Sequence, residues 1–564
     1  MASWCSTVEL LPLKLCDILR FLAQNCQYNF PEDSGFILCY YFEMKKLIKT
    51  RREFIQFLGY GTLTLTQMNL LSSCLSKDAA KLPVKSLFPS IKDDVVLIEG
   101  MNYYPLISWG DKMNAKEVFG FNNDYIDTHI ISSKEMVMWV NHEYVQPIFV
   151  SSNARNKENV DIEKSLVGGS LIKVKKENGK WKFKTDDIHN RGVRANTMIP
   201  FANNVSVMGS KIVEGTLSNC AGGKTPWGNF LTCEENTDHF YGERDRKTGK
   251  VDASPSFVKW ERFYPKNLPE HYGWVVEVEP LTGKAQKLTT LGRFAHESAT
   301  CLMSKSSKAV VYSGDDKKNE HIYKFISSSA DSFDEGILYV ADVKAGKWLP
   351  LDLELSPILK KHYKTQLDVL IDCRGAAKLL GASEMNRPED IEIHPKTGDV
   401  FIALTNNSKK DDYHGSILKI SETGGDYTSL TFKSETFILG GEDFSCPDNL
   451  AFDRNGNLWI VTDMSTSSKK KDLYGKFGNN GLFVIPVSGD KAGQVIQVGS
   501  GPIESELTGL CFVEDQSTLF LSVQHPGERT KDLKNPTSTW PTGTMPKPTV
   551  IALHGKFLEE LTKA

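Results

Sequence analysis

Repetition of one short strand–turn–strand pattern constrains the fold of this 564-residue chain more than any other feature. Segments beginning at Ala295, Arg387, Cys446 and Leu507 each contain a polar start, an alternating apolar run, a polar turn and a second apolar run. Alternation over such short runs, bounded by Gly, Asn and Asp, is typical of β-hairpins. The second half of the chain is therefore predicted to be a series of hairpins rather than helices.

Two earlier copies of the second run end at Tyr144 and Asn236, which brings the number of repeats to six. Blades repeated at this spacing are what a β-propeller requires, because each blade packs against its neighbours around a central channel. We predict an all-β, six-bladed β-propeller with small helical insertions, one of them near residues 357–370. Two β-sandwich domains in tandem remain the alternative.

Composition narrows the class of protein further. Hydrophobic residues make up 40% and charged residues 24% of the chain, as in ordinary globular proteins. The formal charge of −3 gives no basic footprint for nucleic acid. No uninterrupted apolar run of about 18 residues is present, which argues against an integral membrane protein.

Acidic residues recur at one position of the repeat. Glu297, Glu389, Asp448 and Thr508 are separated by 92, 59 and 60 residues. Because inner strands of a propeller converge on its axis, we expect Glu297, Glu389 and Asp448 to face one another at the mouth of the channel. Carboxylates held that close need a cation between them, and oxygen ligands suit Ca²⁺. Simple capping of hairpin turns by acidic side chains remains the alternative.

The second apolar run of each of the six repeats ends in polar residues. In chain order these ends are Asn141-His142-Glu143, Cys233-Glu234-Glu235, Gly314-Asp315-Asp316, Thr405-Asn406-Asn407, Thr462-Asp463 and Gln524-His525.

The segment from Asn219 to Gly228 is the sharpest local motif, with two consecutive glycines and a Pro-Trp-Gly sequence. Glycines of this kind let the backbone approach another group closely. Cys220, with Glu234 and Glu235 one strand later, would place a soft thiolate beside hard carboxylates, which fits a ferric or redox-capable ion. Cys220 as a small buried hydrophobic residue is the alternative.

Arg387 lies two residues before Glu389, so strand alternation puts both side chains on one side of the chain. A guanidinium beside a cation site is shaped for bidentate binding of phosphate. A purely structural salt bridge is the alternative for Arg387.

The N-terminal region contains a predicted export signal. Residues 44–74 begin with a basic stretch, and Thr50-Arg51-Arg52 resembles the twin-arginine motif that an export receptor reads. The sequence from Leu71 to Cys74 resembles a lipobox, in which Cys74 would be lipidated. Residues 1–43 are predicted to be a non-native upstream extension, since such signals begin a chain. Residues 75–564 are predicted to form the propeller, and an amphipathic helix with a chance arginine pair is the alternative to the signal.

These motifs together resemble the PhoX-type alkaline phosphatases, a bacterial family exported by the twin-arginine route. The matching blocks run through most of the mature chain. They are ISWGD (107–111), FGFNNDYI (119–126), VNHEY (140–144), NCAGGKTPWGNFLTCEE (219–235), GRFAHES (292–298), YSGDDKKNEHIYKF (312–325), NRPEDIEIHP (386–395), LTNN (404–407) and CPDNLAFD (446–453). The resemblance departs at Thr50, where the signal usually has Ser, and after Arg387-Pro388, where Glu-Asp replaces Glu-aromatic.

The resemblance implies an alkaline phosphatase that hydrolyses phosphomonoesters with Fe³⁺ and Ca²⁺ at the propeller axis. It implies that Cys220 is a bridging thiolate and that Arg387 and Glu389 are catalytic. It further implies metal ligation by Glu235, Glu297 and Glu389, with Glu143, Glu234, Asp316 and Asp448 as additional cation ligands. Substrate phosphate would be held by Arg387, Asn123 and Lys324.

The implied partners are a small phosphoester and the twin-arginine machinery. The expected protein is a monomer located in the periplasm or anchored to the cell envelope through Cys74. Two other functions remain open: a calcium-dependent propeller lactonase or phosphotriesterase, and a non-catalytic binding propeller that calcium stabilises.

Overall fold

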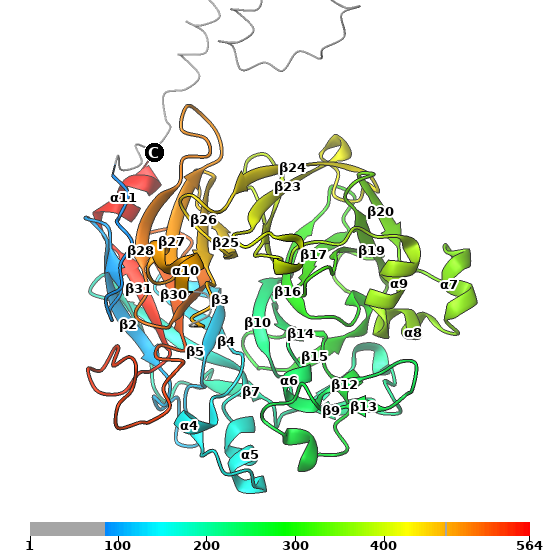
Figure 1. Ribbon diagram of the computed structural model, residues 1–564, viewed down its shortest axis with the longest axis horizontal. Coiled ribbons are helices and arrows are strands. Elements are labelled where there is room, and N and C mark those ends of the chain that lie inside the picture. The colour runs from blue at the N-terminus through cyan, green and yellow to red at the C-terminus, as the bar shows by residue number, and fades with distance from the viewer. Residues whose placement is uncertain (1–84, 468–470, 564) are drawn as a thin grey trace, which may run out of the picture. The chain divides into compact units, whose positions relative to one another are not determined.

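The computed structural model describes residues 85–467 and 471–563, and the predicted export signal with Cys74 lies outside these residues. Six antiparallel sheets surround a central axis (Figure 1). Their innermost strands follow one another in a closed ring, in which β3 neighbours β10, β10 neighbours β16, and so on through β21, β25 and β29 back to β3. The predicted six-bladed propeller is confirmed, and the tandem β-sandwich alternative is wrong.

The blades follow chain order, and within each blade the strands run from the inner to the outer edge. Blade 1 contains β3 (Asn123–Ser132), β4 (Glu135–His142), β5 (Gly168–Glu177) and β6 (Lys180–Phe183), with β7 (Arg191–Arg194) also paired to β5. Blade 2 contains β10 (Asn219–Lys224), β11 (Phe230–Glu234), β14 (Val275–Val278) and β15 (Ala285–Leu288). Blade 3 contains β16 (His296–Met303), β17 (Ala309–Asp315), β18 (Ile322–Ser327), β19 (Gly336–Asp342) and β20 (Lys347–Pro350).

Blade 4 contains β21 (Pro388–Ile393), β22 (Val400–Leu404), β23 (Ser416–Glu422) and β24 (Phe432–Leu439). Blade 5 contains β25 (Pro447–Phe452), β26 (Asn457–Thr462), β27 (Gly481–Pro486) and β28 (Ile496–Ser500), with β1 (Val96–Leu97) added at its outer edge. Blade 6 contains β29 (Glu506–Phe512), β30 (Thr518–Gln524) and β31 (Thr549–His554), and β2 (Asn102–Ser108) completes it.

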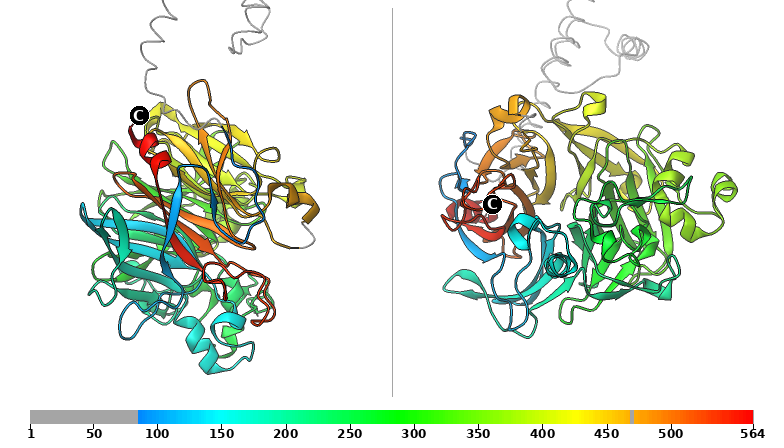
Figure 2. Two further views of the ribbon diagram at one scale, coloured as in Figure 1. Left: turned by 90° about the vertical axis from the view of Figure 1, so that its left-hand side faces the viewer. Right: turned by 60° about the horizontal axis from the view of Figure 1, so that its bottom comes forward.

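The ring is closed by strands from opposite ends of the described chain. β2 pairs antiparallel with β31, so blade 6 is built from residues more than 400 positions apart in sequence. The blue and red strands lie side by side in both views of the propeller (Figures 1 and 2). This pairing removes two free sheet edges and makes the propeller continuous.

Helices and two short hairpins occupy the connections. They are α4 (Pro147–Val150), α5 (Lys157–Lys164), α6 (Asp238–Tyr241), α7 (Pro357–His362), α8 (Gln366–Ile371), α9 (Cys373–Leu380), α10 (Lys471–Tyr474) and α11 (Lys556–Lys563), with hairpins β8 (Met198–Pro200)–β9 (Ile212–Glu214) and β12 (Glu243–Arg244)–β13 (Val251–Asp252). The helices α7 and α8 confirm the predicted insertion near residues 357–370. None of the helices that the structure describes is long and apolar enough to cross a membrane.

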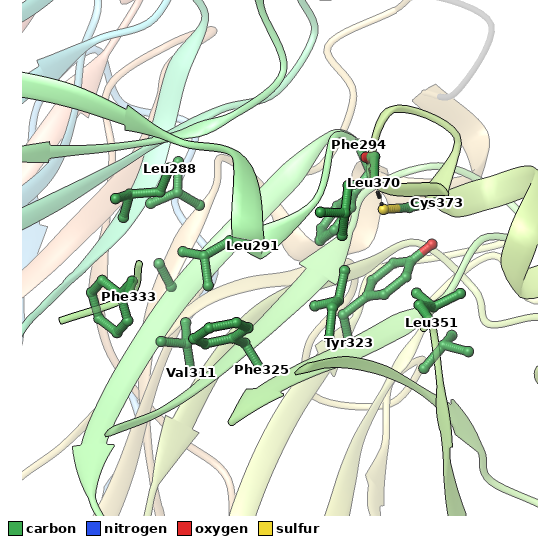
Figure 3. Close-up of a cluster of buried hydrophobic side chains, with 14 of the residues drawn as sticks. Leu288, Leu291, Phe294, Val311, Tyr323, Phe325, Phe333, Leu351, Leu370 and Cys373 are labelled. Atoms are coloured by element: carbon green, nitrogen blue, oxygen red, sulfur yellow. Dashed lines mark hydrogen bonds between the residues drawn. The ribbon is translucent and has the colours of Figure 1, made fainter. Parts of the chain in front are cut away.

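The core lies between neighbouring blades. Figure 3 shows one such cluster, in which Leu288 of blade 2 and Val311, Tyr323 and Phe325 of blade 3 pack with residues of the α8–α9 region. The thiol of Cys373 donates to the carbonyl oxygen of Leu370 at 3.2 Å, which ties the start of α9 to the end of α8. Because each blade buries its faces on two neighbours, the inner strands are held in fixed positions around the axis.

Candidate active site

Every inner strand contains a β-bulge at the same place. In all six blades the pairing of the first and second strands shifts by one residue, so that two inner-strand residues face one partner residue. The last regular pairs before the shift involve Asn123, Asn219, Glu297, Pro388, Pro447 and Thr508. A bulge redirects the side chains next to it, and here it does so at one end of the channel.

In four blades the residue just after the last regular pair lines one common cavity. These residues are Asp124, Cys220, Glu389 and Asp448. Two positions before each of them lies a non-glycine residue in the left-handed region, with φ between 48° and 54°, namely Asn122, Ser218, Arg387 and Cys446. Such conformations are costly and cluster at functional sites.

Blades 3 and 6 differ from this pattern. There the left-handed residue lies inside the bulge, at Ser298 (φ 100°) and Gly509 (φ 61°), and the acids come from earlier positions, Glu297 and Glu506. The predicted alignment of Glu297 and Thr508 with Glu389 and Asp448 is therefore wrong by one residue, and Thr508 does not line the site. The bulge geometry, which spacing does not reveal, produces this offset.

The segment Asn219–Gly228 is largely strand rather than loop, because β10 occupies Asn219–Lys224. Its glycines are required by close packing of neighbouring inner strands. A Cβ on Gly223 would lie 2.0 Å from the carbonyl oxygen of Ala299, and one on Gly222 would lie 2.4 Å from the ring of Tyr125. The close backbone approach that the glycines predict is therefore the approach of β10 to the inner strands of blades 1 and 3.

These elements converge on a cavity of about 90 Å³ at one end of the channel. It is lined by nine carboxylates, one thiol, two amides and a single guanidinium: Asp124, Glu143, Glu235, Glu297, Asp316, Glu389, Asp448, Asp463 and Glu506, with Cys220, Asn236, Asn449 and Arg387. We call this set the acidic cluster.

Three overlapping groups within the acidic cluster bring potential ligand atoms within 4.8 Å of one another. The groups are Cys220–Glu235–Glu297, Glu297–Glu389–Asp448 and Asp448–Asp463–Glu506. Glu297 and Asp448 each belong to two groups, so the ligand atoms form one continuous chain across the channel. The first group contains sulfur and the other two contain only oxygen.

Charge repulsion and burial act on this cluster. Burial raises the pKa of Glu143 to about 7, and burial together with Glu389 and Glu235 raises the pKa of Glu297 well above its ordinary value. Burial, and to a smaller extent the charge of Glu297, also raises the pKa of the Cys220 thiol. This thiol donates to Glu297 Oε2 at 2.7 Å. Without added positive charge, these groups can be accommodated only by taking up protons.

The donor set fits metal ions. Glu235 is buried, and its Oε1 has no hydrogen-bond partner, which is costly unless a cation binds there. Carboxylate oxygens suit Ca²⁺, and a thiolate among carboxylates suits a softer ion such as iron. One guanidinium cannot balance nine carboxylates and a thiolate.

Comparison with known proteins decides the family. The sequence profile described as "Alkaline phosphatase PhoX" matches residues 82–527. This chain belongs to the PhoX family of alkaline phosphatases. It is a phosphoric ester hydrolase that acts on a small phosphoester, as the resemblance in sequence implies.

A solved structure supports the assignment. Pseudomonas fluorescens PhoX in complex with vanadate, a transition state analogue, is similar with a TM-score of 0.76 and 29% identity, over 84% of this chain and 98% of that one. A protein of unknown function from Dyadobacter fermentans (10% identity, TM-score 0.38, 81% and 100% of the chains) and a gluconolactonase from Xanthomonas campestris (9%, 0.29, 81% and 99%) are more distant. No curated protein matches this phosphatase in sequence.

Arg387 of this phosphatase is held by two carboxylates. Its Nε and Nη2 donate to the two oxygens of Asp316 at 2.7 and 2.8 Å, and Nη2 lies 2.8 Å from Glu389 Oε1. The guanidinium in turn lowers the pKa of Asp316 to about 2, against the opposing effect of burial. Asp316 therefore fixes the plane of the guanidinium and leaves Nη1 free of these pairs.

Two predicted site residues lie elsewhere. The side chain of Glu234 is turned away from the acidic cluster, pairs with Lys287 at 2.5 Å and accepts from the backbone N–H groups of Gly273 and Trp274. Lys324 is fully buried between blades 3 and 4, where it pairs with Glu422 at 3.0 Å. The predictions of Glu234 as a ligand and Lys324 as a substrate contact are therefore corrected, because both charges are already neutralised inside the protein.

Asn123 is fully buried beside Asp124, and neither atom of its side-chain amide has a hydrogen-bond partner. It does not line the cavity of the acidic cluster.

Sequence reasoning missed three acids of the cluster as ligands: Asp124, Asp463 and Glu506. Asp463 was visible as the polar end of a repeat, while Asp124 lies within the block FGFNNDYI. Glu506 precedes its repeat segment by one residue and had no counterpart in the other blades, so no spacing signal could have identified it.

Proposed function

We propose that this phosphatase hydrolyses phosphomonoesters at the acidic cluster with bound Fe³⁺ and Ca²⁺. The observation that carries the proposal is the imbalance of charge: nine carboxylates and a thiol surround one guanidinium in a cavity of about 90 Å³. The bound ions would supply neutralisation of the phosphoryl group and Lewis-acid activation of the nucleophile.

The ligands divide by chemistry. Cys220, Glu235 and Glu297 would hold iron, because this is the group with a thiolate. The all-oxygen groups that contain Glu389, Asp448, Asp463 and Glu506 would hold calcium. Asp124 and Glu143 would contribute to the same array, since Gln524 Nε2 donates to both at 2.9 Å and fixes their positions.

Arg387 would orient the substrate. With Nε and Nη2 committed to Asp316 and Glu389, its remaining Nη1 group would donate to a phosphoryl oxygen. Thr405 Oγ1 lies 2.8 Å from Glu389 Oε1 and 3.0 Å from the carbonyl oxygen of Pro447, and donation of its one hydrogen to Glu389 restrains the carboxylate. A fixed guanidinium beside a fixed carboxylate gives the preorganised electrostatics that phosphoryl transfer needs.

Export through the twin-arginine route, with lipidation of Cys74, is part of the proposal. The support for it is that residues 44–74 resemble such a signal in sequence. The envelope location would place the enzyme where extracellular phosphoesters are found.

The test combines metal analysis with activity. The purified enzyme should contain iron and calcium, should release p-nitrophenol from p-nitrophenyl phosphate at alkaline pH, and should stop doing so in a calcium chelator. Cys220→Ala should lose iron and at least 100-fold in kcat/KM, while Glu335→Gln, at an exposed glutamate, should behave as the wild type. Calcium without iron, with retained esterase activity, would favour the lactonase or phosphotriesterase function. Calcium-dependent stability with no turnover would favour a binding propeller.

A further inference from the structure

A second cavity adjoins the acidic cluster and shares one lining residue with it. It has a volume of about 200 Å³, and Glu235 lines both cavities. We call it the side cleft; its lining residues include Thr237, Asp238, Arg246, Phe294, Lys317 and Arg374. Phe294 on its wall belongs to the buried core drawn in Figure 3, so this part of the cleft is rigid.

The volume of the acidic cluster requires an adjoining space for the substrate. Its cavity of about 90 Å³ corresponds to roughly three water molecules, so ions and a phosphoryl group fill it. The alcohol part of an ester must then lie outside the cluster. The side cleft, with space for roughly seven water molecules, is large enough for a three- to five-carbon leaving group.

The arginines of the side cleft are all paired with acids. Arg293 pairs with Glu243 at 2.8 Å, Arg246 with Asp372 at 2.9 Å, Arg374 binds Asp315, and Arg244 binds Glu270. Of these acids, Glu243 and Asp372 also line the cleft, and in each of the four pairs the charges cancel. They account for four of the five cations that line the cleft.

Lys317 is the exception. In the part of the chain that the structure describes it forms no ion pair, and its ammonium donates instead to the side-chain oxygen of Asn236. Asn236 lines the acidic cluster and Lys317 lines the side cleft, so this contact lies where the two cavities meet. An ammonium has three donors, and an amide oxygen takes one of them.

Among the described residues, Asp238 is the one acid lining the side cleft that neither pairs with these arginines nor belongs to the acidic cluster. It lies at the start of α6, is half-buried, and is not among the acids that pair with the four arginines. It would repel an anion in the cleft, so its removal should act in the opposite direction to the removal of Lys317.

We propose that the side cleft is the leaving-group subsite and that Lys317 recognises an anionic group, such as a carboxylate, on the alcohol part of the substrate. This inference rests on the proposed function, because it places the scissile phosphate in the acidic cluster. The substrate class is thereby narrowed to phosphomonoesters with a second negative charge a few bonds from the phosphate.

The test uses two substrates that differ at one group. 3-Phosphoglycerate carries a carboxylate where glycerol 3-phosphate carries a hydroxymethyl group, so the ratio of their kcat/KM values isolates the second charge. We expect the wild type to favour 3-phosphoglycerate, and Lys317→Gln to lower the ratio five- to tenfold. Asp238→Asn should raise the ratio two- to fivefold, and Lys317→Arg should retain most of the preference.

Lys409→Gln is the matched control, because Lys409 is an exposed lysine in a different loop. Its ratio should equal that of the wild type. An unaltered thermal midpoint would show that Lys317→Gln is folded. An unchanged kcat/KM ratio in that folded variant would overturn the inference, as would an equal loss of kcat/KM on both substrates. Failure of the wild type to hydrolyse either substrate or p-nitrophenyl phosphate would instead overturn the proposed function.

Discussion

Two kinds of buried carboxylate occur in this phosphatase. Glu234 and Glu422 lie between or within blades, and each is neutralised by a buried lysine, Lys287 or Lys324. The nine carboxylates of the acidic cluster lie near the axis, and among the described residues that line their cavity Arg387 is the one cation. The chain therefore neutralises acids within its blades by itself but leaves those at the axis to be neutralised by other cations.

The contrast follows from what each arrangement costs. A buried ion pair loses hydration on both partners and regains much of it through mutual attraction and hydrogen bonds, as Glu422 does with Lys324, Tyr312 and Trp348. A group of like charges in a water-poor cavity loses hydration in the same way but has no mutual attraction to offset that loss. Only cations bound from solution make the acidic cluster stable at the pH where its carboxylates are ionised.

Removal of the metals should give the largest difference between the two regions. We expect a calcium chelator to reduce phosphatase activity by at least 100-fold and to lower the thermal midpoint by about 10 °C, since ligands that bind only the folded state stabilise it. Differential scanning calorimetry with and without chelator measures the thermal midpoint, and initial rates under the same two conditions measure the activity. A midpoint that does not respond to chelation would show that the acidic cluster is stabilised by protons alone.

Replacing one glutamate in each region should have opposite effects on stability. Glu389→Gln should lower kcat/KM by at least 100-fold yet raise the free energy of unfolding of the metal-free protein by about 1 kcal/mol, because one repelling charge is gone. Glu422→Gln should keep its activity and lose about 3–5 kcal/mol, because Lys324 is left buried and unpaired. Urea unfolding in chelator and initial rates with metals measure the two quantities. If both substitutions changed the free energy of unfolding of the metal-free protein in the same direction, the two regions would not differ in how their carboxylates are neutralised.

Substitution of Lys324 distinguishes a structural role of this residue from a role in substrate binding. Burial lowers its pKa to about 8, although Glu422 acts against this shift. We expect Lys324→Met to cost about 3 kcal/mol and to leave KM for p-nitrophenyl phosphate within a factor of two. The double variant with Glu422→Gln should recover most of that loss, because neither partner then remains charged. A tenfold rise in KM without a loss of stability would return Lys324 to the active site.

The sequence predicts the propeller well because six repeats of alternating apolar residues determine both the strands and their order. It also predicts much of the acidic cluster, since residues such as Glu235 and Asp316 follow the ends of second strands, where propeller geometry requires convergence. It fails where direction depends on backbone conformation. The left-handed Ser298 and Gly509 shift the ligand positions of two blades, and this cannot be seen from spacing.

The sequence also cannot tell which charges are already paired. Glu234 and Glu235 are adjacent acids at the end of one strand, yet one binds Lys287 and the other lines the acidic cluster. The difference depends on Lys287 of β15, a residue 53 positions away. Pairing of this kind is a property of the folded sheet, so the sequence motif alone indicates both residues as ligands.

The smallest predicted effect concerns His271, which is buried near Lys287. Burial and the nearby Lys287 lower the pKa of His271 to about 4. The unfolded chain takes up a proton at His271 below about pH 6.5, whereas the folded protein does not until about pH 4. The stabilising contribution is therefore complete above pH 6.5 and is lost as the pH falls towards 4. Between pH 7 and pH 5, we expect the free energy of unfolding of the wild type to fall by about 1–2 kcal/mol more than that of His271→Gln. Urea unfolding in chelator at both pH values measures this difference. If the two proteins lose the same free energy of unfolding, His271 is not held neutral in the folded protein.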